Sequence, residues 1–138
     1  MLEVRDLKVS YGGMLAVSKV DLKVPAGKIV ALVGGNGMGK STTLRAIAGL
    51  NMVDRGEIVF DGKAVQRIPA HKRVSLGLGL VPEGRRLFPK LTVRRNLELG
   101  AYTRRDKTEV AESIERMYKL FPILEQRASQ MVGTMSVV

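Results

Sequence analysis

A glycine-rich segment follows directly on a run of apolar residues, and this junction limits what the chain can fold into. The apolar run is Ile29–Val33, and the segment after it reads Gly34-Gly35-Asn36-Gly37-Met38-Gly39-Lys40-Ser41, which fits the pattern G-x-x-x-x-G-K-[ST]. A continuous apolar run is typical of a parallel strand covered on both faces. Downstream, Leu44, Ile47 and Ala48 fall on one face of a helix that we expect to end near Gly49. The order of strand, glycine-rich turn and helix is the setting of a phosphate-binding loop.

Each residue type in this segment has a use in binding phosphate. Glycines allow positive φ and leave no side chain in the way, so successive backbone N–H groups can point at an anion. The positive end of the helix dipole lies near Lys40, and the lysine supplies a mobile cation for the β and γ phosphates. We expect Ser41 to offer its hydroxyl to Mg²⁺ and Thr42 to reach the α phosphate. The alternative is a glycine-rich turn with an exposed lysine.

The first third of the chain has the pattern of strands, and the chain turns helical after Pro82, so an α/β fold is expected. The predicted strands are 2–9, with a bulge at Arg5-Asp6, then 20–24, 29–33, 57–60 and 78–81, of which 29–33 and 78–81 are expected to be buried. A hairpin turn is predicted at Asp61-Gly62. Further helices are predicted at 69–76, from a cap at Thr92 to Leu99, and from a capping box at 106–109 until Pro122 disfavours continuation.

Composition excludes several kinds of site. The chain has no cysteine, which rules out disulfides, thiolate metal sites and a cysteine nucleophile, and its single histidine, His71, rules out a multi-histidine metal site. Three tyrosines, three phenylalanines and no tryptophan leave little aromatic surface for stacking single-stranded nucleic acid. No apolar stretch approaches the ~20 residues that span a bilayer. Charges occupy the N-terminus where a signal peptide needs an apolar core, so we expect a cytoplasmic chain.

The net charge of the 138 residues is +10, and much of the excess lies in one stretch. Between Gly84 and Lys107 there are eight basic and two acidic residues. Two interpretations of this stretch remain open. It is either a solvated surface or a face turned toward phosphate or a membrane-bound partner.

The segment Tyr11-Gly12-Gly13-Met14-Leu15-Ala16-Val17, upstream of the phosphate loop, resembles the adenine loop of ATP-binding cassette (ABC) proteins. The resemblance implies that Tyr11 stacks on adenine and that Val17 lies against the nucleotide. Aromatic stacking on a base contributes roughly 1–3 kcal/mol and needs no base-specific hydrogen bond. The alternative is a half-buried turn tyrosine.

Downstream, Val81-Pro82-Glu83 stands where this family has its Q-loop, which contacts Mg²⁺ and the attacking water. Most members carry glutamine there, and this chain carries Glu83. The run from Val81 to Val93 closely resembles ATP-binding subunits of branched-chain amino-acid importers, as does the run from Gly34 to Thr42. The resemblance therefore implies that Glu83 joins Ser41 at the metal; the alternative is an ordinary exposed loop carboxylate.

The resemblance implies a P-loop NTPase core of the ABC type with an N-terminal antiparallel β subdomain over 1–82. It also implies the Q-loop and the start of a helical subdomain over 83–138. Gly133-Thr134-Met135-Ser136 resembles the approach to the family's signature motif, so we expect the C-terminal half, with the Walker B aspartate, catalytic glutamate and switch histidine, to be missing. Residues 58–61 imitate Walker B only loosely, because Gly62 follows where glutamate belongs.

These features predict weak or no binding of Mg-ATP by the isolated chain and no useful rate of hydrolysis, because the groups that act on the transition state are absent. They also predict open strand edges at 29–33 and 78–81, which favour aggregation, oligomerisation or stabilisation by a partner.

The resemblance favours one function over two alternatives. It implies a truncated ATP-binding subunit of a bacterial importer for branched-chain amino acids, with ATP and Mg²⁺ as cofactors, in the cytoplasm and peripheral on the inner face of the membrane. Its implied partners are transmembrane permease subunits, docked on 85–100, and a second ATP-binding subunit in a homo- or heterodimer, with no nucleic acid. The alternatives are a non-hydrolysing nucleotide-binding or decoy module and a basic nucleic-acid-binding domain, for which the charge is the only support.

Overall fold

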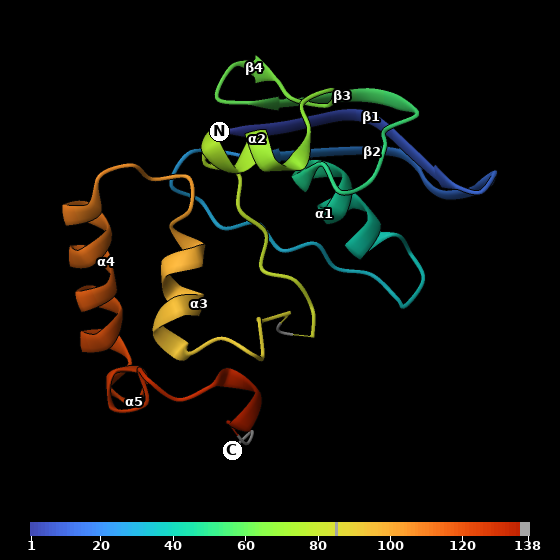
Figure 1. Cartoon of the computed structure of the whole chain (residues 1–138). Coiled ribbons are helices and arrows are strands. Elements are labelled where there is room, and N and C mark those ends of the chain that lie inside the picture. Colours follow the sequence, from blue (N-terminus) through green and yellow to red (C-terminus); the bar gives the residue numbers. More distant parts are fainter. Residues whose placement is uncertain (85, 136–138) are drawn as a thin grey trace. The chain divides into compact units, whose positions relative to one another are not determined.

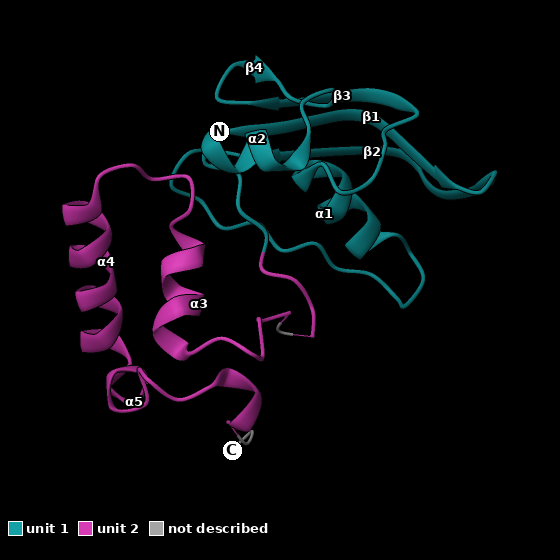
Figure 2. Cartoon of the chain, viewed as in Figure 1, with its two compact units in different colours: residues 1–80 teal, residues 81–138 magenta. Residues whose placement is uncertain are grey.

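The computed structural model describes residues 1–84 and 86–135 and divides the chain into two compact units, Met1–Leu80 and Val81–Val138 (Figures 1 and 2). Unit 1 contains β1 (Leu2–Tyr11), β2 (Met14–Val24), α1 (Lys40–Ala48), β3 (Arg55–Phe60), β4 (Lys63–Ala64) and α2 (Ala70–Ser75). Unit 2 contains α3 (Val93–Gly100), α4 (Lys107–Leu120), α5 (Pro122–Gln126) and the 3-10 helix η1 (Val132–Thr134).

Unit 1 is built on an antiparallel sheet with the strand order β2-β1-β3-β4 (Figure 1). Apolar side chains of one sheet face pack against the inner side of α1, and together they form the core. The buried members of this core are Val4, Leu7, Val9, Val17, Ala46, Ile47, Ile58 and Val65. The N-terminal antiparallel β subdomain predicted from the sequence is therefore confirmed.

A bulge at Asp6 lets β1 keep its apolar side chains on one face. Val4 and Leu7 are both buried although they are three residues apart, and the pairing of β1 with β2 shifts between them. Asp6 has a φ of +48°, its backbone N–H donates to Asp21 Oδ1 at 2.8 Å, and its carboxylate pairs with Arg55 Nε at 2.9 Å. The predicted bulge is confirmed.

The predicted hairpin turn and helix ends are confirmed where glycine was their signal. Asp61 and Gly62 have φ values of +46° and +78° and join Phe60 to Lys63, as in a two-residue type I′ hairpin. Gly49 ends α1 in the left-handed conformation, with a φ of +81°.

Side-chain caps start two helices of unit 2 at the predicted positions. The hydroxyl of Thr92 accepts a hydrogen bond from the N–H of Arg95 at the start of α3. The carboxylate of Asp106 accepts from the N–H groups of Thr108 and Glu109 at the start of α4. Each cap satisfies N–H groups that have no partner within the helix.

The two predicted buried strands, 29–33 and 78–81, are wrong as strands. Ile29 is 100% exposed, Val33 89% and Val81 95%, and neither segment forms a ladder among the described residues. The physical reason is that a buried parallel strand exists only through hydrogen bonds to neighbouring strands, and no described strand pairs with these segments. Several of their side chains instead line an apolar cavity of about 210 Å³ beside α1, including Val30, Leu32, Leu78 and Leu80.

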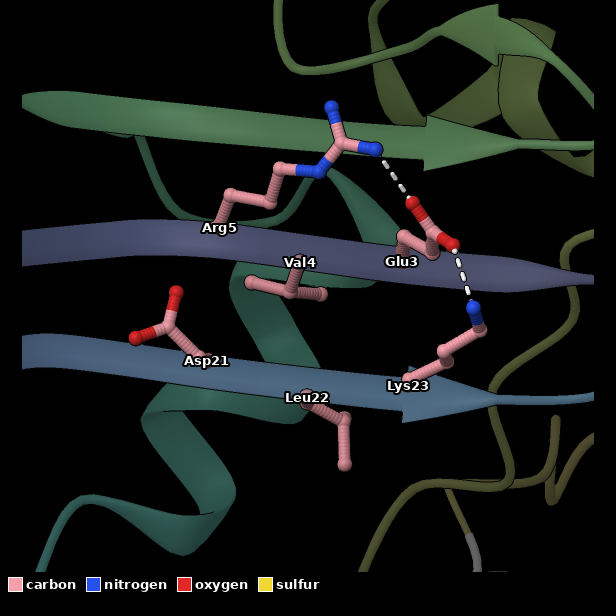
Figure 3. A pocket seen from close by; sticks show the side chains of 6 residues that line it. All are labelled: Glu3, Val4, Arg5, Asp21, Leu22 and Lys23. Carbon is pink, nitrogen blue, oxygen red and sulfur yellow. Dashed lines mark hydrogen bonds and ion pairs between the residues drawn. The ribbon is translucent and has the colours of Figure 1, made fainter.

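The opposite face of β1 and β2 carries paired charges around a shallow pocket (Figure 3). The carboxylate of Glu3 accepts from Arg5 Nη2 at 2.5 Å and pairs with Lys23 Nζ at 3.1 Å. Asp21, also at this pocket, is engaged by the backbone N–H of Asp6. Because these groups already have partners, the pocket is a stabilised sheet face and offers no free acid cluster.

Glu3 should make stability depend on pH. Hydrogen bonds from Lys23 and then Arg5 hold the pKa of its carboxyl below its ordinary value. A folded pKa below the unfolded one stabilises the fold fully above about pH 4.5, and this stabilisation is lost as pH falls through the folded pKa. We expect the free energy of unfolding of the parent to fall more steeply below about pH 4.5 than that of Glu3→Gln. Urea unfolding followed by circular dichroism at several pH values measures this, with Glu115→Gln on α4 as the control. Parallel profiles of the parent and Glu3→Gln would contradict it.

Candidate functional site

The glycine-rich loop is seated on β2 immediately before α1. Gly37 and Gly39 both have a φ of +80°, a conformation that favours glycine. A Cβ at Gly37 would meet nothing within 4 Å, whereas one at Gly39 would come within 2.8 Å of the Ala16 carbonyl oxygen and of Val17 Cγ2. Position 37 therefore needs glycine for its conformation, and position 39 needs it for both conformation and space.

Lys40 turns its ammonium back over the loop. Its Nζ donates to the carbonyl oxygens of Gly34 and Gly35, each at 2.7 Å. A lysine ammonium has three donors, so two bonds to neutral carbonyls leave one donor and the full positive charge for an anion. The loop and the first residue of α1 thus present a fixed cation beside glycines that carry no blocking side chain.

Thr43 closes the first turn of α1 onto the loop, and the sequence pattern missed it. Its backbone N–H and its hydroxyl both donate to the carbonyl oxygen of Gly39, at 2.8 and 2.9 Å, and the residue is 2% exposed. Thr42, the residue before it, is partly buried and its carbonyl oxygen accepts from Asn51 Nδ2 at 3.3 Å, and its contact with the α phosphate stays a prediction. A threonine four residues after a loop glycine, where a hydroxyl can reach the carbonyl four positions back, is the signal that could have found Thr43.

The predicted adenine loop lies in the β1–β2 hairpin, on which the glycine-rich loop is seated. Tyr11 ends β1 and is 45% exposed, so its ring is accessible to a planar ligand. Val17 is 4% exposed and contributes to the core beside Gly39, so it offers little surface to a ligand. The structure thus brings Val17 and the loop together within unit 1, and the contacts of Tyr11 and Val17 with nucleotide stay predictions.

The two predicted magnesium ligands belong to different units. Ser41 is exposed on the first turn of α1 in unit 1, and Glu83 is exposed in unit 2. Hydroxyl and carboxylate oxygens suit Mg²⁺, which keeps several waters and takes other ligands from substrate phosphates. Within 1–84 and 86–135, no group of three His, Asp or Glu side chains is placed to hold a metal. The donor chemistry therefore fits an ion brought with a nucleotide, and the pairing of Ser41 with Glu83 stays a prediction.

Part of the basic stretch in unit 2 is neutralised locally. Arg94 Nε and Arg95 Nη1 both pair with the carboxylate of Glu98, at 3.1 and 2.8 Å, and hydrogen bonds from Arg95 and then Arg94 lower the pKa of that carboxyl. Arg104 pairs with Glu109 at 2.9 Å. Arg85, Ser136 at the end of the signature-like segment, and residues 137–138 after it lie outside the described residues.

Among the described helices, none combines the length and the apolar character needed to cross a membrane. The sequence profile of a family described as ABC transporter matches residues 17–137 of the chain. This match includes the whole glycine-rich loop and α1.

Two similar proteins carry names from amino-acid transport. The high-affinity branched-chain amino acid transport ATP-binding protein BraG of Pseudomonas aeruginosa is 36% identical over 136 residues, which are 99% of this chain and 58% of that protein. The probable branched-chain amino acid transport ATP-binding protein LivF of Archaeoglobus fulgidus is also 36% identical over 136 residues, covering 99% of this chain and 57% of that protein. The chain therefore spans less than two thirds of the length of both relatives.

Importer proteins with other cargo names also match. The sn-glycerol-3-phosphate import ATP-binding protein UgpC of Cereibacter sphaeroides is 33% identical over 96% of this chain. A sulfate/thiosulfate import ATP-binding protein of Mycolicibacterium paratuberculosis is 38% identical over 86% of this chain. A solved structure titled as the ATP-binding subunit of an ABC transporter superposes with a TM-score of 0.82 and 30% identity, over 99% of this chain and 56% of that one.

Proposed function

The chain belongs to the ABC transporter family, and from this premise we propose that it is an ATP-binding subunit of a bacterial importer. The observation that carries the proposal is the Lys40 ammonium held at 2.7 Å from Gly34 and Gly35, over a loop whose Gly37 and Gly39 adopt positive φ. This geometry supplies what a triphosphate needs, which is a cation beside backbone N–H groups at a helix N-terminus.

The residues of unit 1 have separate roles in this proposal. The loop amides and Lys40 bind the phosphates, and the Ser41 hydroxyl faces Mg²⁺, which would neutralise phosphate charge when bound. Thr43 keeps the first turn of α1 closed on Gly39. The ring of Tyr11, exposed at the end of β1, stacks on the base. Glu83 keeps the role of a Mg²⁺ ligand that the family resemblance implies for it.

The cargo we propose is branched-chain amino acids. The support is that both relatives named for this transport match 99% of the chain, against 96% for the glycerol-phosphate relative and 86% for the sulfate relative. The proposed partners are transmembrane permease subunits and a second ATP-binding subunit, which would place the protein on the inner face of the cell membrane.

The proposed docking surface for the permease is the basic segment that includes α3. Arg94 and Arg95 are 66% and 71% exposed and share only one carboxylate, Glu98, so α3 keeps excess positive charge. Replacing both arginines with glutamate should reduce recovery of the complex when the chain is co-expressed with branched-chain permease subunits. The control is the matched replacement of Arg116 and Lys119 on α4, and equal recovery of both double variants would contradict the docking surface.

Adenine recognition by Tyr11 is tested by separating the base from the phosphates. Tyr11→Ala should weaken Mg-ATP binding by roughly 1–3 kcal/mol, the contribution of base stacking, and leave Mg-tripolyphosphate binding unchanged. Tyr11→Phe keeps the ring and should bind Mg-ATP like the parent. Competition titration with both ligands measures the effect. Equal losses for the two ligands, or no loss for Mg-ATP, would remove Tyr11 from the proposed site.

A further inference from the structure

Arg73 on α2 is a buried cation whose hydrogen-bond acceptors are backbone carbonyls. The residue is 2% exposed. Its guanidinium donates to Ile68 at 2.6 Å, Gln66 at 2.9 Å, Ala46 at 2.8 Å and Ile47 at 2.7 Å. No carboxylate of the described chain pairs with it, so neutral carbonyl dipoles alone compensate the charge. Truncating such a group would leave several buried acceptors without a donor at once.

Two of these acceptors belong to the last turn of α1. The final carbonyls of a helix have no partner within it, and the negative end of the helix dipole favours a cation there. Gly49, just after the helix, leaves the space for this cation, because a Cβ on Gly49 would come within 2.8 Å of Arg73 Nε. The sequence around the helix end is therefore fitted to the guanidinium.

The same helix begins at the phosphate loop. With nine residues, α1 is a rod of about 14 Å, short enough that fixing one end orients the other. Its first turn is fixed by Thr43 on Gly39 and by the contact of Gly39 with β2. Its last turn is fixed by Arg73. The carbonyl oxygen of Arg73 also accepts from the N–H of Leu78 at 3.1 Å, so this residue also anchors the start of the segment that runs on to Glu83.

We propose that Arg73 is a positioning residue for the phosphate loop: it holds the C-terminal end of α1 and thereby sets the direction in which Lys40 and the loop amides face. The inference rests on the proposed function for its ligand, Mg-ATP. Lysine cannot replace arginine fully, because a single ammonium with three donors cannot reach four carbonyls spread around a planar fork.

The experiment compares Arg73→Met and Arg73→Lys with the parent chain and with Val65→Ala, a fully buried core control that takes no part in the hydrogen bonds of the Arg73 guanidinium. Mg-ATP affinity is measured at a temperature where every variant is folded, and amide hydrogen exchange is measured along unit 1. We expect Arg73→Met to weaken Mg-ATP binding about tenfold and to speed exchange in α1 more than in β1. Arg73→Lys should recover part of both effects. Val65→Ala should lower the melting temperature and leave the affinity of the folded protein within about twofold.

The outcomes separate this inference from the proposed function. Parent-like affinity and parent-like exchange in α1 for Arg73→Met would overturn the positioning role, as would a loss of affinity in Val65→Ala as large as in Arg73→Met. If Arg73→Met does not fold, the test rests on Arg73→Lys. Parent-like Mg-ATP affinity and parent-like amide hydrogen exchange in α1 for Arg73→Lys would then overturn the positioning role. If the folded parent binds no Mg-ATP, the proposed function fails. The rate of amide hydrogen exchange in α1 of the Arg73 variants then shows independently whether Arg73 holds the end of this helix.

Discussion

Replacing Gly39 with alanine is expected to lower the free energy of unfolding by about 3 kcal/mol and to abolish Mg-ATP binding. The new Cβ would lie 2.8 Å from the Ala16 carbonyl oxygen and from Val17 Cγ2, and the backbone φ of +80° disfavours any side chain. Neither neighbour can yield easily, because one is strand backbone and the other is a core valine that is 4% exposed. The loop would have to lift off β2, and Lys40 would move with it.

Gly37→Ala is the matched control for this change. Gly37 has the same φ of +80°, but a Cβ there meets nothing within 4 Å, so only the conformational cost remains, about 1 kcal/mol. Urea unfolding and nucleotide titration of both variants measure the difference. Equal destabilisation of the two variants would show that the contact of the loop with β2 at Gly39 does not contribute to the free energy of unfolding.

Gly56→Ala is expected to destabilise the fold more than Gly39→Ala does. It should lower the free energy of unfolding by about 4 kcal/mol or more. Gly56 has a φ of +103°, and a Cβ there would lie 2.5 Å from the Asp6 carbonyl oxygen and 2.6 Å from that of Arg5. These atoms form the bulge that keeps Val4 and Leu7 on one face of β1. Since domains of this size are stable by only about 5–15 kcal/mol, the variant should show little cooperative unfolding at room temperature.

Gly62→Ala controls for a glycine with positive φ in the same sheet. Its φ is +78° and a Cβ there meets nothing within 4 Å, so a loss of about 1 kcal/mol is expected. Melting curves by circular dichroism compare the two variants. A Gly56→Ala protein as stable as Gly62→Ala would show that the bulge tolerates a side chain and that the close approach of β3 to β1 is not essential.

Features set by neighbouring residues were predictable from the sequence. The bulge at Asp6, the turn at Asp61-Gly62, the caps at Thr92 and Asp106 and the end of α1 at Gly49 are all confirmed. Each depends on one residue type whose φ preference or side-chain hydrogen bond acts within a few positions of the chain. The glycine-rich loop belongs to this class, because its pattern encodes both its conformation and its cation.

Features set by distant residues were not predictable. The apolar runs 29–33 and 78–81 have the composition of buried strands, but a strand requires a hydrogen-bonded neighbour, and the described chain supplies none for them. No sequence pattern singled out Arg73, because nothing near it in the chain shows that four carbonyls from α1 and from 66–68 converge on its guanidinium. The place of Glu83 in the site likewise depends on tertiary structure and stays a prediction.

Calorimetric titration of the folded chain with ATP in the presence of magnesium tests the triphosphate site most directly. The sequence leaves open whether the isolated chain binds Mg-ATP weakly or not at all, and the loop geometry favours weak binding. We therefore expect saturable heat for the parent and for Lys28→Ala, which changes an exposed lysine upstream of the loop, and no detectable heat for Lys40→Ala. Circular dichroism on the same samples shows whether each protein is folded. Absence of heat from folded parent, or identical binding by Lys40→Ala, would contradict a triphosphate site at residues 34–41.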